Sequence, residues 1–482
     1  MDKGEVADLA SFKHVDDPSQ NPDSGIAATD RYGHALVEYD PATERHLRNK
    51  IDLYIVPIVA LLYLFCFIDR ANMGNAKIAG LEKDLGMSGY DYNGVVSVFY
   101  VSYILFEIPL NLLCKWMGPG WFIPITTLLF GIVSLGTAFA TTLAQLSAVR
   151  FLLGIFEAGM MPGIAYYLSR WYRRSELAFR LGLLEKFGSL HSWRMIFAIE
   201  GIITISLGLL GLAFLTDRPE TARWLSPEEK RLAVLRVKSE RVGNTTVLDK
   251  MDKRKLILGI TCPITLSTAV AFMLNNITVQ GLAFFLPTIV GGIYPQASTV
   301  RKQLYTVPPY IIGAFFVLFL PLVSWRIDRR QILLIGSAPL VMVGYCMFLG
   351  SQDQAVRYGA TFLITSSLFA VGPLSNAQVS ANVVSDTARS SAIGTNVMMG
   401  NIGGLVSGWS FLPWDGPDYH IGNGLNLAAA GTVLIVCSLT LAWMNRDNKR
   451  RDQIDVDAEL SGLSEQQIED LDWKHPAFRW RP

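Results

Sequence analysis

Long apolar stretches alternate with short polar segments through most of the chain. Eleven of them reach the length of about 20 residues that a helix needs to cross a membrane. Five precede residue 216 and six follow residue 257. They cover residues 52–72, 93–114, 121–142, 146–168, 195–215, 258–286, 305–325, 331–350, 358–379, 390–411 and 424–444. The pattern predicts an all-α, polytopic membrane protein.

The polar segments divide this pattern into parts. We expect a disordered tail over 1–48, a first helical bundle over 49–215, a central loop over 216–256, a six-helix bundle over 257–445 and a second tail over 446–482. Lys and Arg are in excess in the central loop and in Arg446–Arg451, just after the last apolar stretch. Loops rich in Lys and Arg stay on the cytoplasmic side, so both termini are expected there.

Composition narrows the class of protein. Of 482 residues, 51% are hydrophobic and 17% are charged, whereas soluble domains carry about 25% charged residues. The net charge of +1 gives no reason to expect a nucleic-acid partner. The five cysteines lie in apolar stretches, and the histidines and cysteines show no metal-ligand spacing. Without a Ser-His-acid pattern either, the sequence predicts no enzyme, cofactor or metal site.

Ionisable residues inside the apolar stretches are the candidate chemistry, because such residues normally face a bundle interior or a wet cavity. Asp69 and Arg70 lie about 28 Å along a helix that starts near Lys50, at 1.5 Å per residue. The alternative is an interfacial helix end, with Arg70 reaching the headgroups. Glu107 shares a face with Tyr103 and is either a proton carrier or a structural hydrogen-bond partner. Glu157 is either a titrating acid or a permanently paired one.

Amides and phenols are the candidate ligands in the second half. Asn276 and Gln280 share one helix face, Tyr310 follows two prolines, and Asn396 and Asn401 lie in a glycine-rich stretch. Such groups orient a small polar ligand in a cavity. Each of them is also compatible with a simple interhelical hydrogen bond.

Several segments carry a family resemblance. They are "LLYLFCFIDRANMGNAKIAGL", "YNGVVSVFYVSYILFEIPLNLL", "RFLLGIFEAGMMPGIAYYLSRWYRR" and "DRPETARWLSPEEKRLA". The chain resembles the major facilitator superfamily and, within it, the anion:cation symporters of the fungal allantoate- and nicotinate-permease branch. "LYTVPPY", "GNIGG" and "WSFLPWDGPDYHIGNGLNLAAAG" are most similar to the nicotinate group.

This resemblance implies roles for particular residues. Arg70 would bind the substrate carboxylate, while Asp69 and Glu157 would couple protons, with Glu107 as a further candidate. "SWRIDRR" resembles the cytoplasmic Asp-Arg loop motif, which implies gating roles for Asp328 and Arg329. Tyr103, Asn276, Gln280, Tyr310, Asn396 and Asn401 complete the candidate substrate contacts.

The chain departs from the family between Arg180 and Trp193. Both flanks of the 195–215 stretch are basic, and one crossing cannot place both in the cytoplasm. The twelve residues 181–192 span only about 18 Å as a helix, short of a ~30 Å membrane core. A transmembrane helix is therefore expected to be missing here, through alternative splicing or a faulty gene model.

The sequence thus predicts a major-facilitator-like, two-bundle transporter. It would act as a monomer in the plasma membrane and import a small organic anion, nicotinate-like or allantoate-like, together with protons. One alternative is transport of a neutral or cationic vitamin or drug. Another is a nutrient sensor that does not transport, which a truncated first half would permit.

Overall fold

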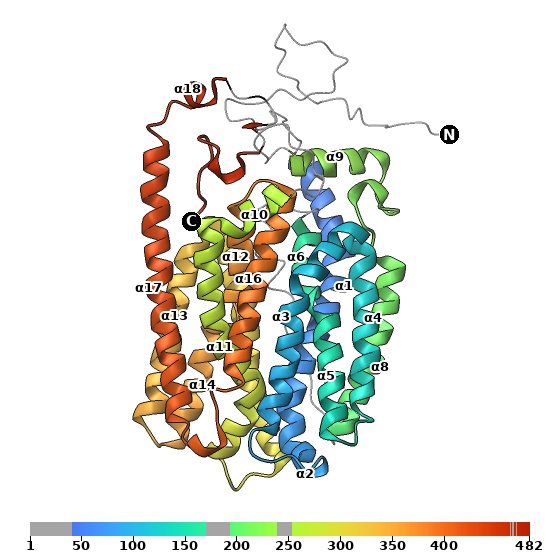
Figure 1. Cartoon of the computed structure of the whole chain (residues 1–482), viewed down its shortest axis with the longest axis vertical. Helices are drawn as coiled ribbons and strands as arrows, with labels where there is room; N and C mark the ends of the chain where they lie inside the picture. The colour runs from blue at the N-terminus through green and yellow to red at the C-terminus, as the bar shows by residue number, and fades with distance from the viewer. Residues whose placement is uncertain (1–40, 170–192, 239–252, 463, 465–466, 469) are drawn as a thin grey trace, which may run out of the picture.

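The computed structural model is all-helical and describes residues 41–169, 193–238, 253–462, 464, 467–468 and 470–482. Most of the expected first tail and the whole of the 181–192 segment lie outside the described residues. Long helices run parallel to one axis, with α9 (Pro227–Lys238) and the C-terminus at one end. The short helix α2 (Glu82–Asp84) marks the other end (Figure 1). We call these the α9 end and the α2 end.

The described residues of the first half form five crossings. They are α1 (Pro41–Ala76), α3 (Asp91–Met117), α4 (Pro119–Thr137), α5 (Leu143–Ala158) continued by α6 (Met160–Ser169), and α8 (Trp193–Phe214). A π-helical turn, Lys77–Leu81, joins α1 to α2. The fourth crossing is interrupted at Gly159, where a Cβ atom would lie 2.6 Å from the Phe122 ring.

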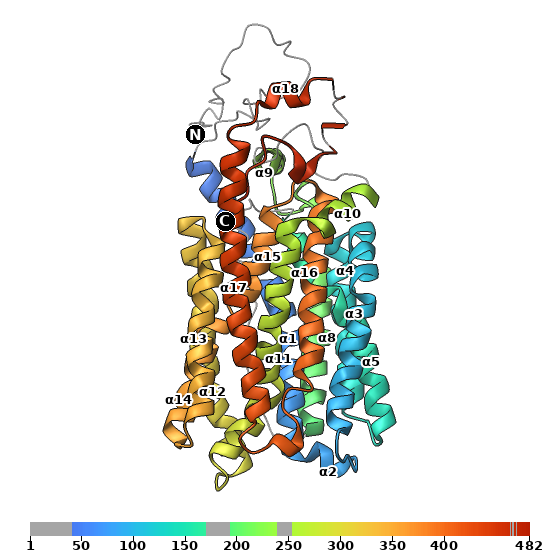
Figure 2. The same ribbon diagram turned by 60° about the vertical axis from the view of Figure 1, so that its left-hand side comes forward.

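In the second half, residues 253–462 form six crossings. A short α10 (Lys253–Thr261) leads into α11 (Pro263–Ile293), followed by α12 (Thr299–Ile327) and α13 (Arg330–Gly350). Then come α14 (Gln354–Leu368) with α15 (Val371–Ala381), α16 (Asp386–Ser407) and α17 (His420–Arg451), with α18 (Val456–Leu460) beyond the last crossing. Figure 2 shows α17 along the outside of this half.

Ten helical segments in the described part of the chain are long and apolar enough to span a membrane. Ten of the eleven expected stretches correspond to them. The eleventh, 390–411, forms the long helix α16 but is not among the ten. Its polar residues, among them Asn396 and Asn401, are buried against neighbouring helices. α16 therefore lies inside the protein, where it needs less hydrophobicity than a lipid-facing helix.

The direction of α8 shows at which end of the molecule each basic flank of the 195–215 stretch lies. At its start Trp193 donates to Asp84 of α2 over 2.8 Å, so α8 begins at the α2 end. Beyond its last turn Asp217 accepts a hydrogen bond from Gly120, at the start of α4. α8 therefore ends at the α9 end, and the second half is not inverted relative to the first. The position at which a helix is expected to be missing, between Arg180 and Trp193, lies outside the described part of the chain.

The two halves meet along α1 with α11 and along α3 with α16. Close backbone approach is visible at Gly74 of α1, where an added Cβ would lie 2.5 Å from the carbonyl oxygen of Phe284. At Gly403 the corresponding distance to the Met273 carbonyl within the second half is 2.0 Å. Small residues let membrane helices approach closely in this way.

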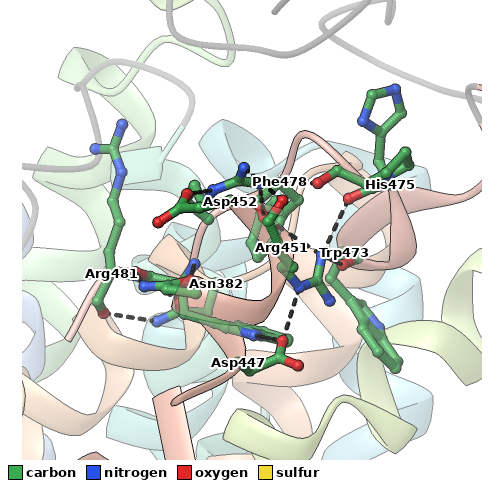
Figure 3. A network of polar contacts seen from close by, with 12 residues as sticks. Asn382, Asp447, Arg451, Asp452, Trp473, His475, Phe478 and Arg481 are labelled. Atoms are coloured by element: carbon green, nitrogen blue, oxygen red, sulfur yellow. Dashed lines mark hydrogen bonds and ion pairs between the residues drawn. The ribbon is translucent and has the colours of Figure 1, made fainter. Parts of the chain in front are cut away.

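The C-terminal segment folds back onto the α9 end of the second half (Figure 3). The Asp472 carboxylate accepts the backbone N–H groups of Val384 and Ser385, 2.9 and 2.8 Å away, at the start of α16. Asn382 exchanges two hydrogen bonds with the Arg481 backbone. Arg451 of α17 donates to three tail carbonyls. This part of the expected tail 446–482 is an ordered element of the fold.

Candidate functional site

A cavity between the two halves contains most of the candidate substrate contacts. Its volume is about 50 Å³, which corresponds to roughly four water molecules at 10–15 Å³ each. The first half supplies Tyr63, Phe67, Arg70, Tyr103 and Met161. The second half supplies Phe272, Asn275, Asn276, Val279, Gln280, Phe369, Gly372, Pro373, Val397 and Asn401. A small ligand with an apolar ring and a polar group matches this lining.

Arg70 brings positive charge to the cavity wall. It is 6% exposed, and its guanidinium donates to the Glu157 carboxylate of α5. The same group lies over the rings of Phe99 and Tyr103, 5.7 and 5.4 Å from their centroids. Aromatic faces attract cations, so these rings hold the guanidinium in position. This burial is incompatible with an interfacial helix end at Asp69 and Arg70.

Asp69 points to a different partner from its neighbour. Its carboxylate accepts a hydrogen bond from Arg150 of α5 over 2.5 Å and one from Ser134 of α4 over 3.4 Å. Adjacent residues on a helix project about 100° apart, which separates the two partners. Arg150 and Glu157 lie two turns apart on α5. Two crossed ion pairs therefore join α1 to α5 inside the first half.

Glu107 is completely buried on α3, one turn beyond Tyr103. Neither of its carboxylate oxygens has a hydrogen-bond partner in the described part of the chain. The structural hydrogen bond considered from the sequence is thus absent among these residues. A buried charge without a partner is strongly disfavoured, and neutralisation by a proton removes that cost.

Amide groups form the second-half wall. Asn401 donates to the carbonyl of Val397 in its own helix over 2.9 Å, which leaves its carbonyl oxygen for other contacts. The side-chain oxygen of Gln280 is buried without a partner among the described residues. Asn275, the neighbouring amide in the same helix, lines the cavity beside Asn276. The wall therefore offers several donors and acceptors without a formal charge.

Two expected substrate contacts are not in the cavity lining. The Tyr310 hydroxyl donates to the carbonyl of Leu282 over 3.3 Å. Asn396 is fully buried and donates to Ser375 and Asn376 over 3.2 and 3.0 Å. Both side chains join helices of the second half, which is the interhelical alternative.

The expected gating residues, Asp328 and Arg329, lie in the loop between α12 and α13. Asp328 accepts a hydrogen bond from Arg330 over 2.9 Å, not from Arg329. Arg330 is 1% exposed, whereas Arg329 is exposed at the start of α13. Arg330 also donates its backbone N–H to the carbonyl of Pro482. The buried arginine of this loop therefore connects to the C-terminal segment.

Sequence reasoning missed Glu200 of α8, a fourth buried acid among the described first-half helices. It is 3% exposed and accepts a hydrogen bond from Asn72 of α1 over 2.8 Å. The signal was available, since Glu200 is an isolated carboxylate in the apolar 195–215 stretch. The rule that selected Glu107 and Glu157 applies to it equally.

Residues 59–408 match the family model of the Major Facilitator Superfamily. The chain belongs to the major facilitator superfamily. An uncharacterized transporter of Schizosaccharomyces pombe is 32% identical over 467 residues, covering 92% of this chain and 91% of the relative. The high-affinity nicotinic acid transporter of Saccharomyces cerevisiae is 30% identical over 502 residues, covering 99% of this chain and 92% of the relative.

Solved structures agree with this assignment at the level of the fold. The proton:xylose symporter XylE bound to 6-bromo-6-deoxy-D-glucose superposes with a TM-score of 0.62 at 15% sequence identity. That match covers 79% of this chain and 95% of XylE. The protein is thus a multi-pass membrane transporter of this superfamily and not an enzyme. The superfamily itself does not identify the substrate.

Proposed function

We propose that this transporter imports a small organic anion, nicotinate-like or allantoate-like, together with protons. The observation that carries the proposal is the buried guanidinium of Arg70 at the cavity wall, held by Glu157 and two aromatic rings.

An anion site needs a positive group whose present partner can be displaced. The planar guanidinium of arginine matches a carboxylate with two parallel hydrogen bonds. A substrate carboxylate in the cavity competes with Glu157 for these donors. The cavity volume of about 50 Å³ limits the ligand to a small molecule.

The remaining lining favours a flat ring next to the carboxylate. Tyr63, Phe67, Phe272 and Phe369 supply aromatic walls. The amides of Asn276 and Gln280 face the same space and suit a polar ring atom. A pyridine carboxylate satisfies all three requirements, and a relative of similar length carries the name of a nicotinic acid transporter. We therefore rank nicotinate-like acids above allantoate-like ones.

Proton coupling follows from the same competition. When a substrate anion takes Arg70, the buried Glu157 carboxylate loses its counter-charge. An unpaired buried carboxylate is strongly disfavoured, so Glu157 then takes up a proton. Substrate and proton thus favour each other's binding, which is the thermodynamic requirement of symport.

The orientation in this proposal uses the positive-inside rule. The basic residues Arg446–Arg451 and those beside α9 lie at the α9 end. The α9 end would then face the cytoplasm, with the described C-terminus on that side and the α2 end outside. The plasma membrane and a monomeric state remain part of the proposal.

Uptake of labelled nicotinate by yeast cells without their own nicotinate uptake tests the proposal. We expect saturable uptake that increases as the external pH falls. Arg70→Lys is expected to raise KM at least tenfold, about 1.4 kcal/mol in binding free energy, because lysine lacks the planar fork. Arg301→Lys, an exposed arginine at the α2 end, is the matched control and should leave KM unchanged.

The outcomes separate the alternatives. Uptake of nicotinate with a normal KM in Arg70→Lys refutes the arginine clamp. Accumulation of a neutral or cationic compound, but of neither nicotinate nor allantoate, favours the alternative substrate class. Absence of any uptake in vesicles that contain folded protein favours the sensor.

A further inference from the structure

Among the described residues of the first-half helices, the buried charged groups do not balance. Four of these side chains are acids, and two, Arg70 and Arg150, are arginines. Each arginine holds one acid, Glu157 and Asp69 respectively. The two acids left without an arginine in the described part of the chain are Glu107 and Glu200. Near neutrality in a buried, low-dielectric region therefore requires two bound protons.

Glu200 and Glu107 differ in what surrounds them. Glu107 has no hydrogen-bond partner among the described residues. Glu200 uses one oxygen to accept from Asn72 over 2.8 Å, while its other oxygen, Oε1, has no donor in the described part. Asp69 lies one turn before Asn72 on the same face of α1, and Arg150, which binds Asp69, also lies over the ring of Phe197, one turn before Glu200 on α8. This geometry brings the carboxyl groups of Asp69 and Glu200 close together. Two carboxyl groups at such close range favour a state in which they share one proton.

The groups that face this carboxyl pair come from four helices. Arg150 on α5 is the one cation among the described residues there, and it also lies 4.9 Å from the Phe197 ring centroid. Its Nε and NH2 donors are buried without partners in the described part. These spare donors allow Arg150 to stabilise the second carboxylate when the shared proton leaves. The other groups that face the pair are Cys66 and Asn72 of α1 and Ser134 of α4. The pair itself consists of Asp69 on α1 and Glu200 on α8.

We propose that Glu200 is a second proton-binding residue of the transport cycle, which shares its proton with Asp69 across the α1–α8 contact. This step rests on the proposed proton-coupled function. A proton from the outer aqueous phase binds the carboxylate to give a carboxylic acid, and the same proton leaves to the inner phase. Glu157 carries one proton and Glu200 carries a second, so two protons accompany each monovalent anion. One net positive charge therefore enters per cycle.

The first test measures stoichiometry in proteoliposomes with nicotinate as the probe. The reversal potential at set pH and substrate gradients should correspond to two protons per anion for the original protein. For Glu200→Gln, one proton per anion makes transport electroneutral, so the nicotinate-dependent current should disappear while proton-driven nicotinate accumulation remains. Nicotinate exchange without a gradient should persist in the variant, which shows that the substrate site is intact. Glu228→Gln, an exposed carboxyl on α9, is the matched control and should keep two.

The second test does not depend on any substrate. Infrared difference spectra of the purified protein across a pH step report protonated carboxyl groups directly. Glu200→Gln should lose one carboxylic-acid band that Glu228→Gln keeps. Glu200→Asp, which restores a carboxyl group, should recover that band at a shifted pH.

The two tests separate this inference from the proposed function. A lost band together with no nicotinate transport supports Glu200 as a proton site and refutes the substrate assignment. An unchanged band in folded Glu200→Gln, or an unchanged stoichiometry of two, overturns the role of Glu200 whatever the substrate.

Discussion

Truncation of Trp480 to alanine is expected to release the C-terminal segment from the α9 end. Trp480 is 2% exposed and packs against the rings of Trp443, Trp473 and Phe478, at centroid distances of 5.3, 5.8 and 5.1 Å. Its indole N–H donates to Asp447 over 2.7 Å. Trp→Ala at a buried site costs about 3–5 kcal/mol. We take about 4 kcal/mol, which corresponds to a ~10³-fold loss in the docking equilibrium.

The effect should appear where the segment contacts α16. Asp472 binds the backbone N–H groups of Val384 and Ser385, and that first turn of α16 also reaches the first half. Lys115 of α3 donates to Thr387, and Asn111 donates to the carbonyl of Ser390. Loss of the docked segment should therefore loosen a contact between the two halves.

Hydrogen–deuterium exchange of peptides covering 382–390 and 472–482 provides the assay. Both should exchange much faster in Trp480→Ala, while peptides from α4 and α8 stay unchanged. Trp414→Ala removes a 60% exposed tryptophan near the α2 end and serves as the matched control. Unchanged exchange of the 382–390 peptide in Trp480→Ala would refute the reasoning that the segment holds the start of α16.

Four further predictions concern coupling, packing, acid and the gene. Glu157→Gln keeps shape but cannot titrate, so nicotinate accumulation against a gradient should fall sharply, to what the proton on Glu200 can drive, while exchange persists; undiminished accumulation moves the role of Glu157 to Asp69 or Glu107. Gly74→Ala adds a Cβ 2.5 Å from the Phe284 carbonyl, so the melting temperature in detergent should drop, and an unchanged value contradicts the close approach. Although partial burial raises the pKa of Glu229, hydrogen bonds from Lys50 and the Ser226 backbone lower it overall. The contact between α1 and α9 should therefore hold above the unfolded pKa of about 4.3 and weaken as pH falls below it. The rate of proteolysis of α9 should then rise as pH falls, and a rate that does not rise refutes this prediction. Full-length transcripts should encode an apolar segment between Arg180 and Trp193, and transcripts of the present sequence alone exclude that expectation.

Helical periodicity predicted the first-half candidates better than the second-half ones. Ionisable residues in apolar helices must face protein or water, so the face of Glu107 and Glu157 could be read from the sequence alone. Amides carry a smaller penalty, and α16 is surrounded by protein. Because every side of α16 faces protein, the sequence could not show which way Asn396 and Asn401 point, and only Asn401 lines the cavity. The partners of Asp69 and Arg70 lie on another helix, and nothing in the local sequence names them.

The uneven distribution of charge between the halves has a consequence for the mechanism proposed here. In the described cavity wall the formal charge comes from α1, while the second half contributes neutral amides and rings. A bound carboxylate would exchange one ion pair, Arg70 with Glu157, for another. That exchange changes little at the α1–α11 contact itself. Closure of the second half around the ligand must then draw on the weaker amide and aromatic contacts. Substitutions of Asn276 or Gln280 should accordingly change substrate preference while leaving proton coupling intact, whereas substitutions of the buried acids should do the reverse.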